Sequence, residues 1–258
     1  MHTNFRTKKR FGQHFLVDQT IIDLITKHIN VKSNDLMVEI GPGNGAITKP
    51  LAQYKPKLHL IEFDRDLIPI LHQKFKSDSN IIIHHEDALK FDYSLLGQDL
   101  RLVGNLPYNI STPLLFHLIQ YRKNITDLNF MLQKEVAERL TASPGNKTFS
   151  KLTIMFGTFM DTEHLFDIPA TAFKPSPKVT SSIVRIMPKN DSQILINDLN
   201  VLEKIVTSAF SQRRKTLRNS LKGIISDKIM QEVEIDPNQR AEELSIPIWT
   251  KLANKITK

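Results

Sequence analysis

The sequence contains no cysteine in its 258 residues. Disulfide bonds, thiolate zinc sites and cysteine nucleophiles are therefore excluded. Long apolar segments are also absent, since no run approaches the roughly 18 residues that a helix needs to span a bilayer. The first fifteen residues, which read MHTNFRTKKRFGQHF, are basic but lack the apolar stretch of a signal peptide. We therefore expect a cytoplasmic protein.

Acidic residues are in deficit. The chain has 27 Asp and Glu against 35 Lys and Arg, which gives a net charge of +8 at pH 7. A basic surplus of this size points to nucleic acid, an anionic membrane surface or a ribosome as partner. A merely basic soluble enzyme is the alternative that charge leaves open. The length suits one large domain, or one large and one small domain.

The first half of the chain alternates between expected strands and expected helices. Apolar and β-branched runs predict strands at residues 35–40, 58–64, 80–87, 101–108 and 127–133, with helices at 47–53, 65–76, 112–121 and around 134–140. This alternation implies a parallel sheet that helices cover on both faces. Ligands of such sheets bind at the carboxyl ends of the strands. Glu62, Asp87 and Asn105 lie there, at the ends of three consecutive strands.

The pattern changes after residue 160. A segment punctuated by prolines leads into a β-rich run at residues 179–187, and from residue 198 onward only helical patterns follow. The predicted fold class is α/β, Rossmann-like with a mostly parallel central sheet, plus a small all-α C-terminal domain. We expect a catalytic domain at residues 1–190, with a basic arm at 1–12, and a helical domain at 191–258.

The stretch EIGPGNGA, residues 39–46, closes the first strand and opens a helix. Glycines in such a turn let the backbone approach a ligand closely. An acid at the end of the next strand, here Glu62, can accept hydrogen bonds from both ribose hydroxyls of that ligand. The stretch also fits the dinucleotide pattern G-x-G-x-x-G/A, so NAD is a competing cofactor, and a plain tight turn is a third interpretation.

Three features favour S-adenosylmethionine over NAD. Glu39 precedes Gly41 by two positions, Asp87 can accept a hydrogen bond from the adenine amine, and the fourth strand delivers NLPY, residues 105–108, to the same edge. Asp87 could also cap a helix that follows it, and the two roles are compatible. The adjacent histidines at 84 and 85 point to opposite faces of a strand, so we expect no metal site there.

These residues together resemble a known family, the ribosomal RNA adenine N6-dimethyltransferases. The resemblance runs from about residue 10 to about residue 254 and includes the stretches FGQHFL, VEIGPGNGAIT, IEFDRDL, GNLPYNISTPLLFHL, MLQKEVAERL, FKPSPKVTSSIVR, FSQRRKTLRNSL and RAEEL. Several of these stretches are long, and they occur in the order of the family. The C-terminal motifs resemble the bacterial branch that acts on small-subunit (16S) rRNA, whereas other relatives act on large-subunit (23S) rRNA.

The resemblance implies a class I methyltransferase that transfers four methyl groups, two to each of two adjacent adenosines near the 3′ end of 16S rRNA. It implies 16S rRNA, within the 30S subunit or its assembly intermediate, as the partner of a monomeric enzyme without membrane or metal. The residues that carry over as cofactor contacts are His14, Leu16, Gly41, Gly43, Glu62, Asp87 and Asn105. Position 14 is often Asn in relatives, so the contact of His14 is a departure.

The catalytic stretch Asn105, Leu106, Pro107 and Tyr108 suits methylation of an amine. Adenine's exocyclic nitrogen is a poor nucleophile, because its lone pair is delocalised into the ring. The Asn105 side-chain oxygen and the Leu106 carbonyl can accept its hydrogens and stabilise the charge that develops. The base must first be flipped out. We expect Tyr108 to stack on one face and Phe173 on the other, although a packed loop aromatic and a core residue are the plainer interpretations.

A basic run near the C-terminus predicts the RNA surface. On one helix, residues 214 and 218 are spaced i, i+4 and residues 215 and 222 are spaced i, i+7. The predicted phosphate contacts are Arg213, Arg214, Lys215, Arg218 and Lys222. A solvated helix face is the plainer interpretation.

Two other functions stay open at this stage: a non-catalytic RNA-binding assembly factor on the same fold, and an NAD-linked oxidoreductase.

Overall fold

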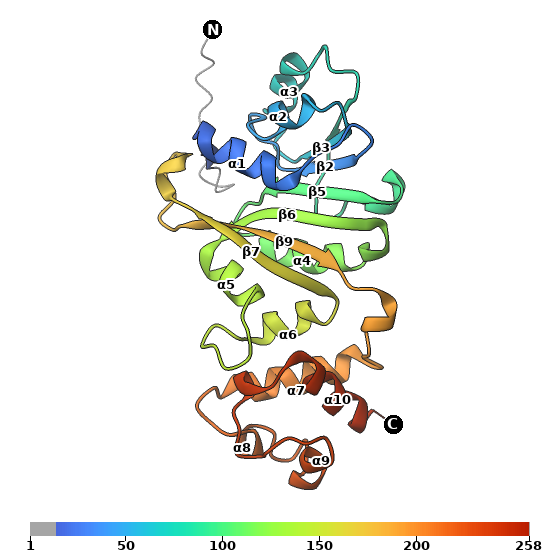
Figure 1. The fold of residues 1–258 in the computed structure, drawn as a ribbon, viewed down its shortest axis with the longest axis vertical. Coiled ribbons are helices and arrows are strands. Elements are labelled where there is room, and N and C mark those ends of the chain that lie inside the picture. The colour runs from blue at the N-terminus through green and yellow to red at the C-terminus, as the bar shows by residue number, and fades with distance from the viewer. Residues whose placement is uncertain (1–13, 258) are drawn as a thin grey trace. The chain divides into compact units, whose positions relative to one another are not determined.

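The computed structural model describes residues 14–257 (Figure 1). The predicted basic arm at residues 1–12 lies outside the described residues. The described chain packs into two compact units, one formed by the residues up to Ala137 with Glu163–Pro188, the other by Glu138–Thr162 with the residues from Lys189 onward.

A seven-stranded sheet organises the first unit, in the order β4-β3-β2-β5-β6-β9-β7. Its strands are β2 (Leu36–Ile40), β3 (Lys57–Glu62), β4 (Ile81–His85), β5 (Leu100–Asn105), β6 (Ile125–Gln133), β7 (Met160–Ile168) and β9 (Ser181–Pro188). Neighbouring strands from β4 to β6 pair in parallel, and β9 runs antiparallel to β6. The predicted mostly parallel α/β sheet is therefore confirmed.

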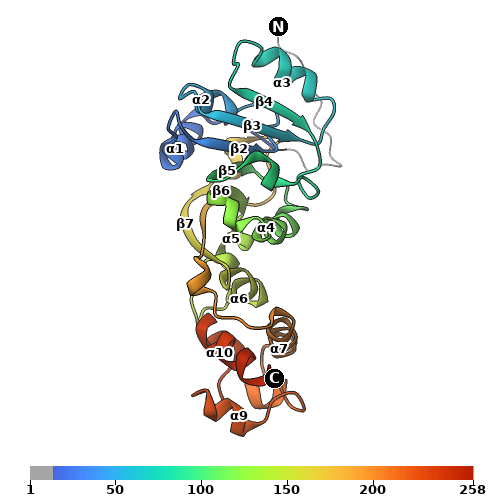
Figure 2. The same ribbon diagram turned by 90° about the vertical axis from the view of Figure 1, so that its right-hand side faces the viewer.

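Helices cover both faces of this sheet (Figure 2). They are α1 (Gln19–Ile29), α2 (Thr48–Ala52), α3 (Ile68–Lys74), α4 (Ser111–Ile119) and α5 (Lys134–Leu140). Helix α1 lies on one face and α4 on the other. Helix α1 begins after Asp18, whose side chain accepts a hydrogen bond from the Ile21 N–H, and it ends at Asn30 in the left-handed conformation.

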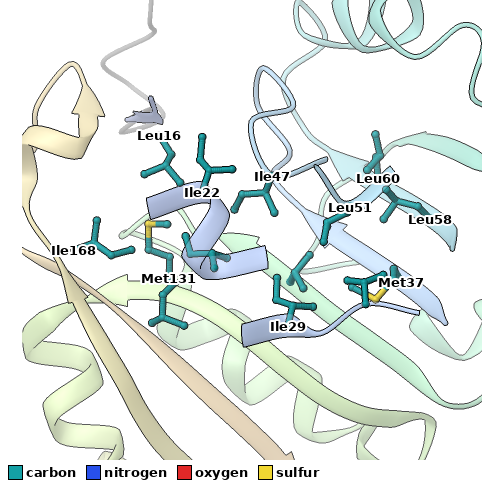
Figure 3. Close-up of a cluster of buried hydrophobic side chains, with 14 of the residues drawn as sticks. Leu16, Ile22, Ile29, Met37, Ile47, Leu51, Leu58, Leu60, Met131 and Ile168 are labelled. Carbon is teal, nitrogen blue, oxygen red and sulfur yellow. The ribbon is translucent and has the colours of Figure 1, made fainter. Parts of the chain in front are cut away.

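Helix α1 is held by its apolar face. Ile22 and Ile29, seven residues apart, project from one side of the helix and join a core that includes Met37 of β2 and Met131 of β6 (Figure 3). Burial of each such side chain contributes roughly 1.5–3 kcal/mol. Helix α1 is thus anchored on the sheet, and the segment that precedes it is held in place as well.

That preceding segment forms a small sheet of its own. Strand β1 (Phe15–Leu16) pairs antiparallel with β8 (Phe173–Lys174), so that Phe15 lies opposite Lys174 and Leu16 opposite Phe173. The N–H of Val17 continues the contact by donating to the Ala172 carbonyl at 2.9 Å. Two segments more than 150 residues apart in sequence are thereby fixed side by side.

The second unit is helical. It contains α6 (Lys151–Gly157), α7 (Leu199–Ser211), α8 (Leu217–Ser220), α9 (Asp227–Glu232) and α10 (Ile246–Ile256). Trp249 of α10 is fully buried and packs in one cluster with Ile205 of α7 and Ile154 of α6. The predicted all-α C-terminal region is confirmed, and residues 138–162 pack with it. The division of function between residues 1–190 and 191–258 stays a prediction.

Candidate active site

A cavity of about 390 Å³ lies at the carboxyl ends of the parallel strands. Strand β2 has β3 on one side and β5 on the other, so the order of the sheet reverses there. Sheets of this kind bind their ligands at such a reversal. The cavity is lined by Gly41 after β2, Glu62 at the end of β3, Asp87 after β4 and Asn105 at the end of β5. Four residues predicted from separate stretches of sequence therefore meet in one site.

Two glycines allow the backbone to pack closely around this cavity. Gly43 has φ +58°, and a Cβ there would lie 3.0 Å from the Phe15 ring. At Gly104 a Cβ would lie 2.5 Å from the Ile40 carbonyl oxygen, so only glycine lets β5 approach β2 here. The glycine-rich turn is also attached to the next strand, because the Gly43 N–H donates to Glu62 Oε2 at 3.1 Å.

Glu62 presents a buried carboxylate to the cavity. Its side chain is 6% exposed. Oε2 accepts from the Gly43 N–H, and Oε1 accepts from the Asp64 N–H at 2.8 Å. Burial raises the pKa of Glu62 above its usual value, and the two backbone donors oppose that shift. The Phe63 backbone opposes the shift as well. The acceptor positions that these donors leave on the carboxylate suit the hydroxyls of a ribose.

The cavity lining also includes an acid and an exposed ring, Asp87 and Phe63. Asp87 Oδ1 accepts from the Leu89 N–H at 3.0 Å, which caps a turn rather than a helix and leaves Oδ2 for a ligand amine. Phe63 follows Glu62 directly, lines the cavity and is 59% exposed. Phe63 is not among the residues predicted from the sequence, although an aromatic residue just after a strand-terminal acid is a usable signal. Its ring offers an apolar face to a planar ligand.

Glu39 adds a second buried acid to the cavity. Its side chain is 2% exposed and accepts a hydrogen bond of 2.6 Å from the Thr48 hydroxyl. Burial raises the pKa of Glu39 from 4.5 to about 7. A positively charged ligand group would stabilise the ionised form of this side chain. This set of carboxylate acceptors thus fits S-adenosylmethionine, which carries ribose hydroxyls, an adenine amine and a cationic sulfur.

The segment around His14 contacts the catalytic loop through its backbone. The His14 carbonyl accepts a hydrogen bond of 2.9 Å from Asn105 Nδ2. Its ring Nδ1 donates to the Pro175 carbonyl at 2.6 Å. Leu16 lines the cavity and is buried against the core. The departure from Asn at position 14 leaves the backbone contact to Asn105 unaffected.

The loop after β5, residues 105–110, lines the cavity. Because Asn105 Nδ2 is bonded to His14, the side-chain Oδ1 is left to accept from a ligand. Leu106 is buried. The Pro107 carbonyl accepts from the Ile110 N–H at 3.1 Å, which closes a turn that leads into α4.

Tyr108 is half-buried at the edge of the same loop. Its hydroxyl lies 2.9 Å from the Ser181 hydroxyl of β9. Its ring lies 5.9 Å from the His14 ring, centroid to centroid, at an interplanar angle of 27°. Burial raises the pKa of Tyr108, so its hydroxyl is neutral at physiological pH. Tyr108 lines the cavity. The contact of its hydroxyl with Ser181, which the sequence did not predict, restrains the tilt of the ring.

Phe173 is not brought to the cavity. Its side chain is 2% exposed and packs in the core with Leu16 and Ile183. Its neighbour across the small sheet, Leu16, holds it there. In this structure it is a core residue, which was the plainer interpretation of the sequence. Stacking on a base would require the ring to leave the core, so that role stays a prediction.

The prediction of one continuous basic helix over residues 211–222 is wrong. Helix α7 ends at Ser211, residues 212–215 form a turn, and α8 begins only at Leu217. The reason is tertiary, since the N–H groups of Leu217 and Arg218 donate to the carbonyls of Gln239 and Pro237 instead of continuing a helical pattern. The i, i+4 and i, i+7 pairs therefore do not share a helix face.

The five basic side chains are all exposed, but they differ in their partners. Arg213 donates to the backbone carbonyls of residues 147 and 149, and Arg218 pairs with Asp227 at 2.8 Å. No ion pair of Arg214, Lys215 or Lys222 occurs within the described part of the chain. These three cations are the ones available to a phosphate backbone.

His84 contacts another histidine. Its Nε2 lies 2.8 Å from Nδ1 of His59, and the two rings are stacked.

Among residues 14–257 no group of three or more possible metal ligands occurs. Within the same range no helix is both long and apolar enough to cross a bilayer.

Comparison with known proteins gives a consistent result. The family model described as ribosomal RNA adenine dimethylase matches residues 4–258. A protein of Dechloromonas aromatica called ribosomal RNA small subunit methyltransferase A is 47% identical over 250 residues, which cover 97% of this chain and 98% of the relative. A protein of the same name from Pseudomonas fluorescens is 48% identical, covering 97% of this chain and 94% of the relative.

Solved structures show the same likeness. A dimethyladenosine transferase from Plasmodium falciparum is 27% identical with a TM-score of 0.80, over 93% of this chain and 96% of that one. The 23S rRNA methyltransferase ErmE has a TM-score of 0.76 at 22% identity, over 95% of this chain and all of its own, and shares the fold.

Proposed function

Because this chain belongs to the ribosomal RNA adenine dimethylase family, we propose that it dimethylates N6 of two adjacent adenosines in the 3′-terminal hairpin of 16S rRNA. Its partner is the 30S subunit or an assembly intermediate, on which it acts as a monomer in the cytoplasm during small-subunit biogenesis. The observation that carries the proposal is the convergence of Glu62, Asp87 and Asn105 in one cavity beside Tyr108.

S-adenosylmethionine is the methyl donor, and when bound it supplies a methyl group on a positively charged sulfur. Glu62 accepts hydrogen bonds from the ribose hydroxyls, Asp87 accepts from the adenine amine, and Phe63 contacts the adenine ring. Gly41 and Gly43 let the backbone lie close to the ligand. The segment of His14 and Leu16 closes this side of the cavity.

The acceptor amine is held by oxygens of the catalytic loop. Asn105 Oδ1 and the Leu106 carbonyl accept its two hydrogens, which draws the nitrogen toward tetrahedral geometry and stabilises the charge that develops on it. The methylated amine is acidic, so its proton passes to water and no strong base is required. Tyr108 stacks on the flipped adenine. Pro107 keeps the turn rigid between the Leu106 carbonyl and the Tyr108 ring. Phe173 covers the other face once its ring leaves the core.

RNA binding depends on the second unit. Arg214, Lys215 and Lys222 contact phosphates directly. Arg213 keeps the turn in place through residues 147 and 149, and Arg218 turns to phosphate only by leaving Asp227. Each phosphate contact releases counterions, so the affinity depends steeply on salt.

Methylation of purified, unmodified 30S subunits tests the proposal. Protein, labelled S-adenosylmethionine and subunits are incubated, and the product nucleosides are identified by mass. We expect N6,N6-dimethyladenosine at two adjacent positions, four methyl groups per subunit. Asn105→Ala should abolish transfer, because it removes an acceptor oxygen for the amine. Its cofactor Kd is measured by calorimetry beside the assay, because the change also removes the contact to His14.

The other outcomes identify the competing functions. Methylation of 50S-derived 23S rRNA in place of 16S rRNA would support the large-subunit branch. Tight binding to 30S particles without any methylated product would support a non-catalytic assembly factor. Calorimetric binding of NAD but not of S-adenosylmethionine would overturn the proposal altogether.

A further inference from the structure

The hydroxyl of Ser181 is positioned to hold the Tyr108 ring. Ser181 is the first residue of β9, and its Oγ lies 2.9 Å from the Tyr108 hydroxyl. Ser181 is fully buried, so water has no access to replace it as a partner. The side chain does not line the cavity. It therefore reaches the substrate side only through the tyrosine.

The geometry explains what such a contact would do. A tyrosine side chain has two rotatable bonds, and its hydroxyl lies at the end opposite its Cα. With the backbone held by the turn at one end and the hydroxyl held by Ser181 at the other, the tilt of the ring is fixed. Rotation about the long axis of the ring is restricted by the His14 ring, 5.9 Å away. The two contacts together define the plane of the ring.

We propose that Ser181 is a positioning residue that orders the Tyr108 ring before the adenine arrives. This inference rests on the proposed function, since it takes the ring to be a platform for the flipped base. A platform that is already ordered loses no side-chain freedom when the base stacks on it. Ser181 thus acts on the acceptor side of the reaction and leaves the cofactor side unchanged.

The next residue is a matched control. Ser182 is also fully buried, but strand alternation turns its side chain the other way. Its hydroxyl donates to Asp167 Oδ1 at 2.7 Å, whereas the Tyr108 hydroxyl bonds to Ser181. Ser181→Ala and Ser182→Ala therefore remove the same atom from equally buried neighbours, and only the first change frees the tyrosine.

A double-mutant cycle tests the coupling. We expect Ser181→Ala and Tyr108→Phe each to lower kcat/KM for the RNA roughly three- to tenfold, the cost of ordering a freed side chain. The double variant should lose no more than either single variant, because both changes break one contact. Cofactor Kd should stay constant throughout, and Ser182→Ala should leave kcat/KM unchanged. Losses that multiply in the double variant would overturn the proposal.

A second measurement needs no catalysis. The chain has four tyrosines, so 3-fluorotyrosine labelling gives few fluorine resonances, and the one lost in Tyr108→Phe is assigned. In the free protein we expect that resonance to shift in Ser181→Ala and to stay in place in Ser182→Ala. An unmoved resonance in a folded Ser181→Ala protein would overturn the positioning role. A wild-type protein that methylates no rRNA would overturn the proposed function instead, and the spectra would still decide the role of Ser181.

Discussion

Replacement of Glu62 by alanine should weaken S-adenosylmethionine binding by one to two orders of magnitude. In the folded protein, Oε1 already accepts from the Asp64 N–H and Oε2 from the Gly43 N–H. The Phe63 backbone also bonds to this carboxylate, and the acceptor positions that remain are the ones open to the ribose hydroxyls. A hydrogen bond to a charged group contributes about 1.5–3 kcal/mol. If the alanine variant loses the free energy of one such hydrogen bond, the Kd for S-adenosylmethionine rises roughly 10- to 150-fold.

The pH dependence of binding gives a second measure of the same residue. Burial raises the pKa of Glu62, so acidification protonates it earlier than a free glutamate, and a protonated carboxyl has one acceptor fewer. Cofactor affinity of the wild type should therefore fall as pH decreases toward and through that raised pKa. Glu62→Gln keeps the shape but does not titrate, so its weaker affinity should change less over the same range, with only the part that Glu39 contributes remaining.

Calorimetry at pH 8 and at mildly acidic pH, with RNA affinity measured beside it, checks both expectations. Asp66→Ala is the control, because it removes one negative charge from the same loop at a half-exposed position. The melting temperature must be measured too, since Glu62→Ala also frees two backbone donors. An unchanged cofactor Kd in a folded Glu62→Ala protein, or an equal loss in Asp66→Ala, would refute the assignment.

Three further predictions concern stacking, RNA and stability. Tyr108→Ala should lose about 1–3 kcal/mol of stacking, roughly 5- to 150-fold in kcat/KM for RNA. The loss should come on top of the one that Tyr108→Phe shows at equal melting temperature, and a fully active Ala variant would contradict this. The double change Arg214→Ala with Lys215→Ala should lower the slope of log K against log salt by about one to two, whereas Lys251→Ala, which removes a paired cation, should not. The pKa of Glu39 is raised to about 7 in the folded protein, so its contribution to the free energy of unfolding is fully present below about pH 4.5 and is lost as pH rises through 7. Between pH 5 and pH 8 the free energy of unfolding in urea of Glu39→Gln, which does not titrate, should therefore rise by up to about 3 kcal/mol relative to that of the wild type. A difference between the two proteins that stays constant with pH would refute this.

The cofactor half of the site could be predicted because its residues are tied to strand ends. A run such as residues 36–40 is buried nearly throughout, and parallel strands bring their carboxyl ends to one edge regardless of the details of packing. Glu62, Asp87 and Asn105 therefore had to meet once the strands were identified. Sequence periodicity supplies this kind of information directly.

The remaining features depend on contacts between distant segments. The basic run at residues 211–222 has a helical spacing, but the backbone of Leu217 and Arg218 bonds to residues 237–239, which no local pattern reveals. Phe173 was assigned by its motif, whereas its burial depends on pairing with Leu16, which lies 157 positions away in the sequence. The Ser181 contact spans 73 residues.

If Asn105 holds the acceptor amine as proposed, its orientation explains why the loop after β5 carries an amide rather than an acid. The acceptor amine needs oxygens directed at its hydrogens, and an ionised aspartate would supply them as well. However, the other end of this side chain faces the His14 carbonyl at 2.9 Å. A carboxylate would place two acceptors against each other there, whereas an amide donates to the carbonyl and so turns Oδ1 toward the ligand. In the proposed function the segment before α1 therefore contributes to the acceptor site, because its backbone sets which atom of Asn105 is left for a ligand.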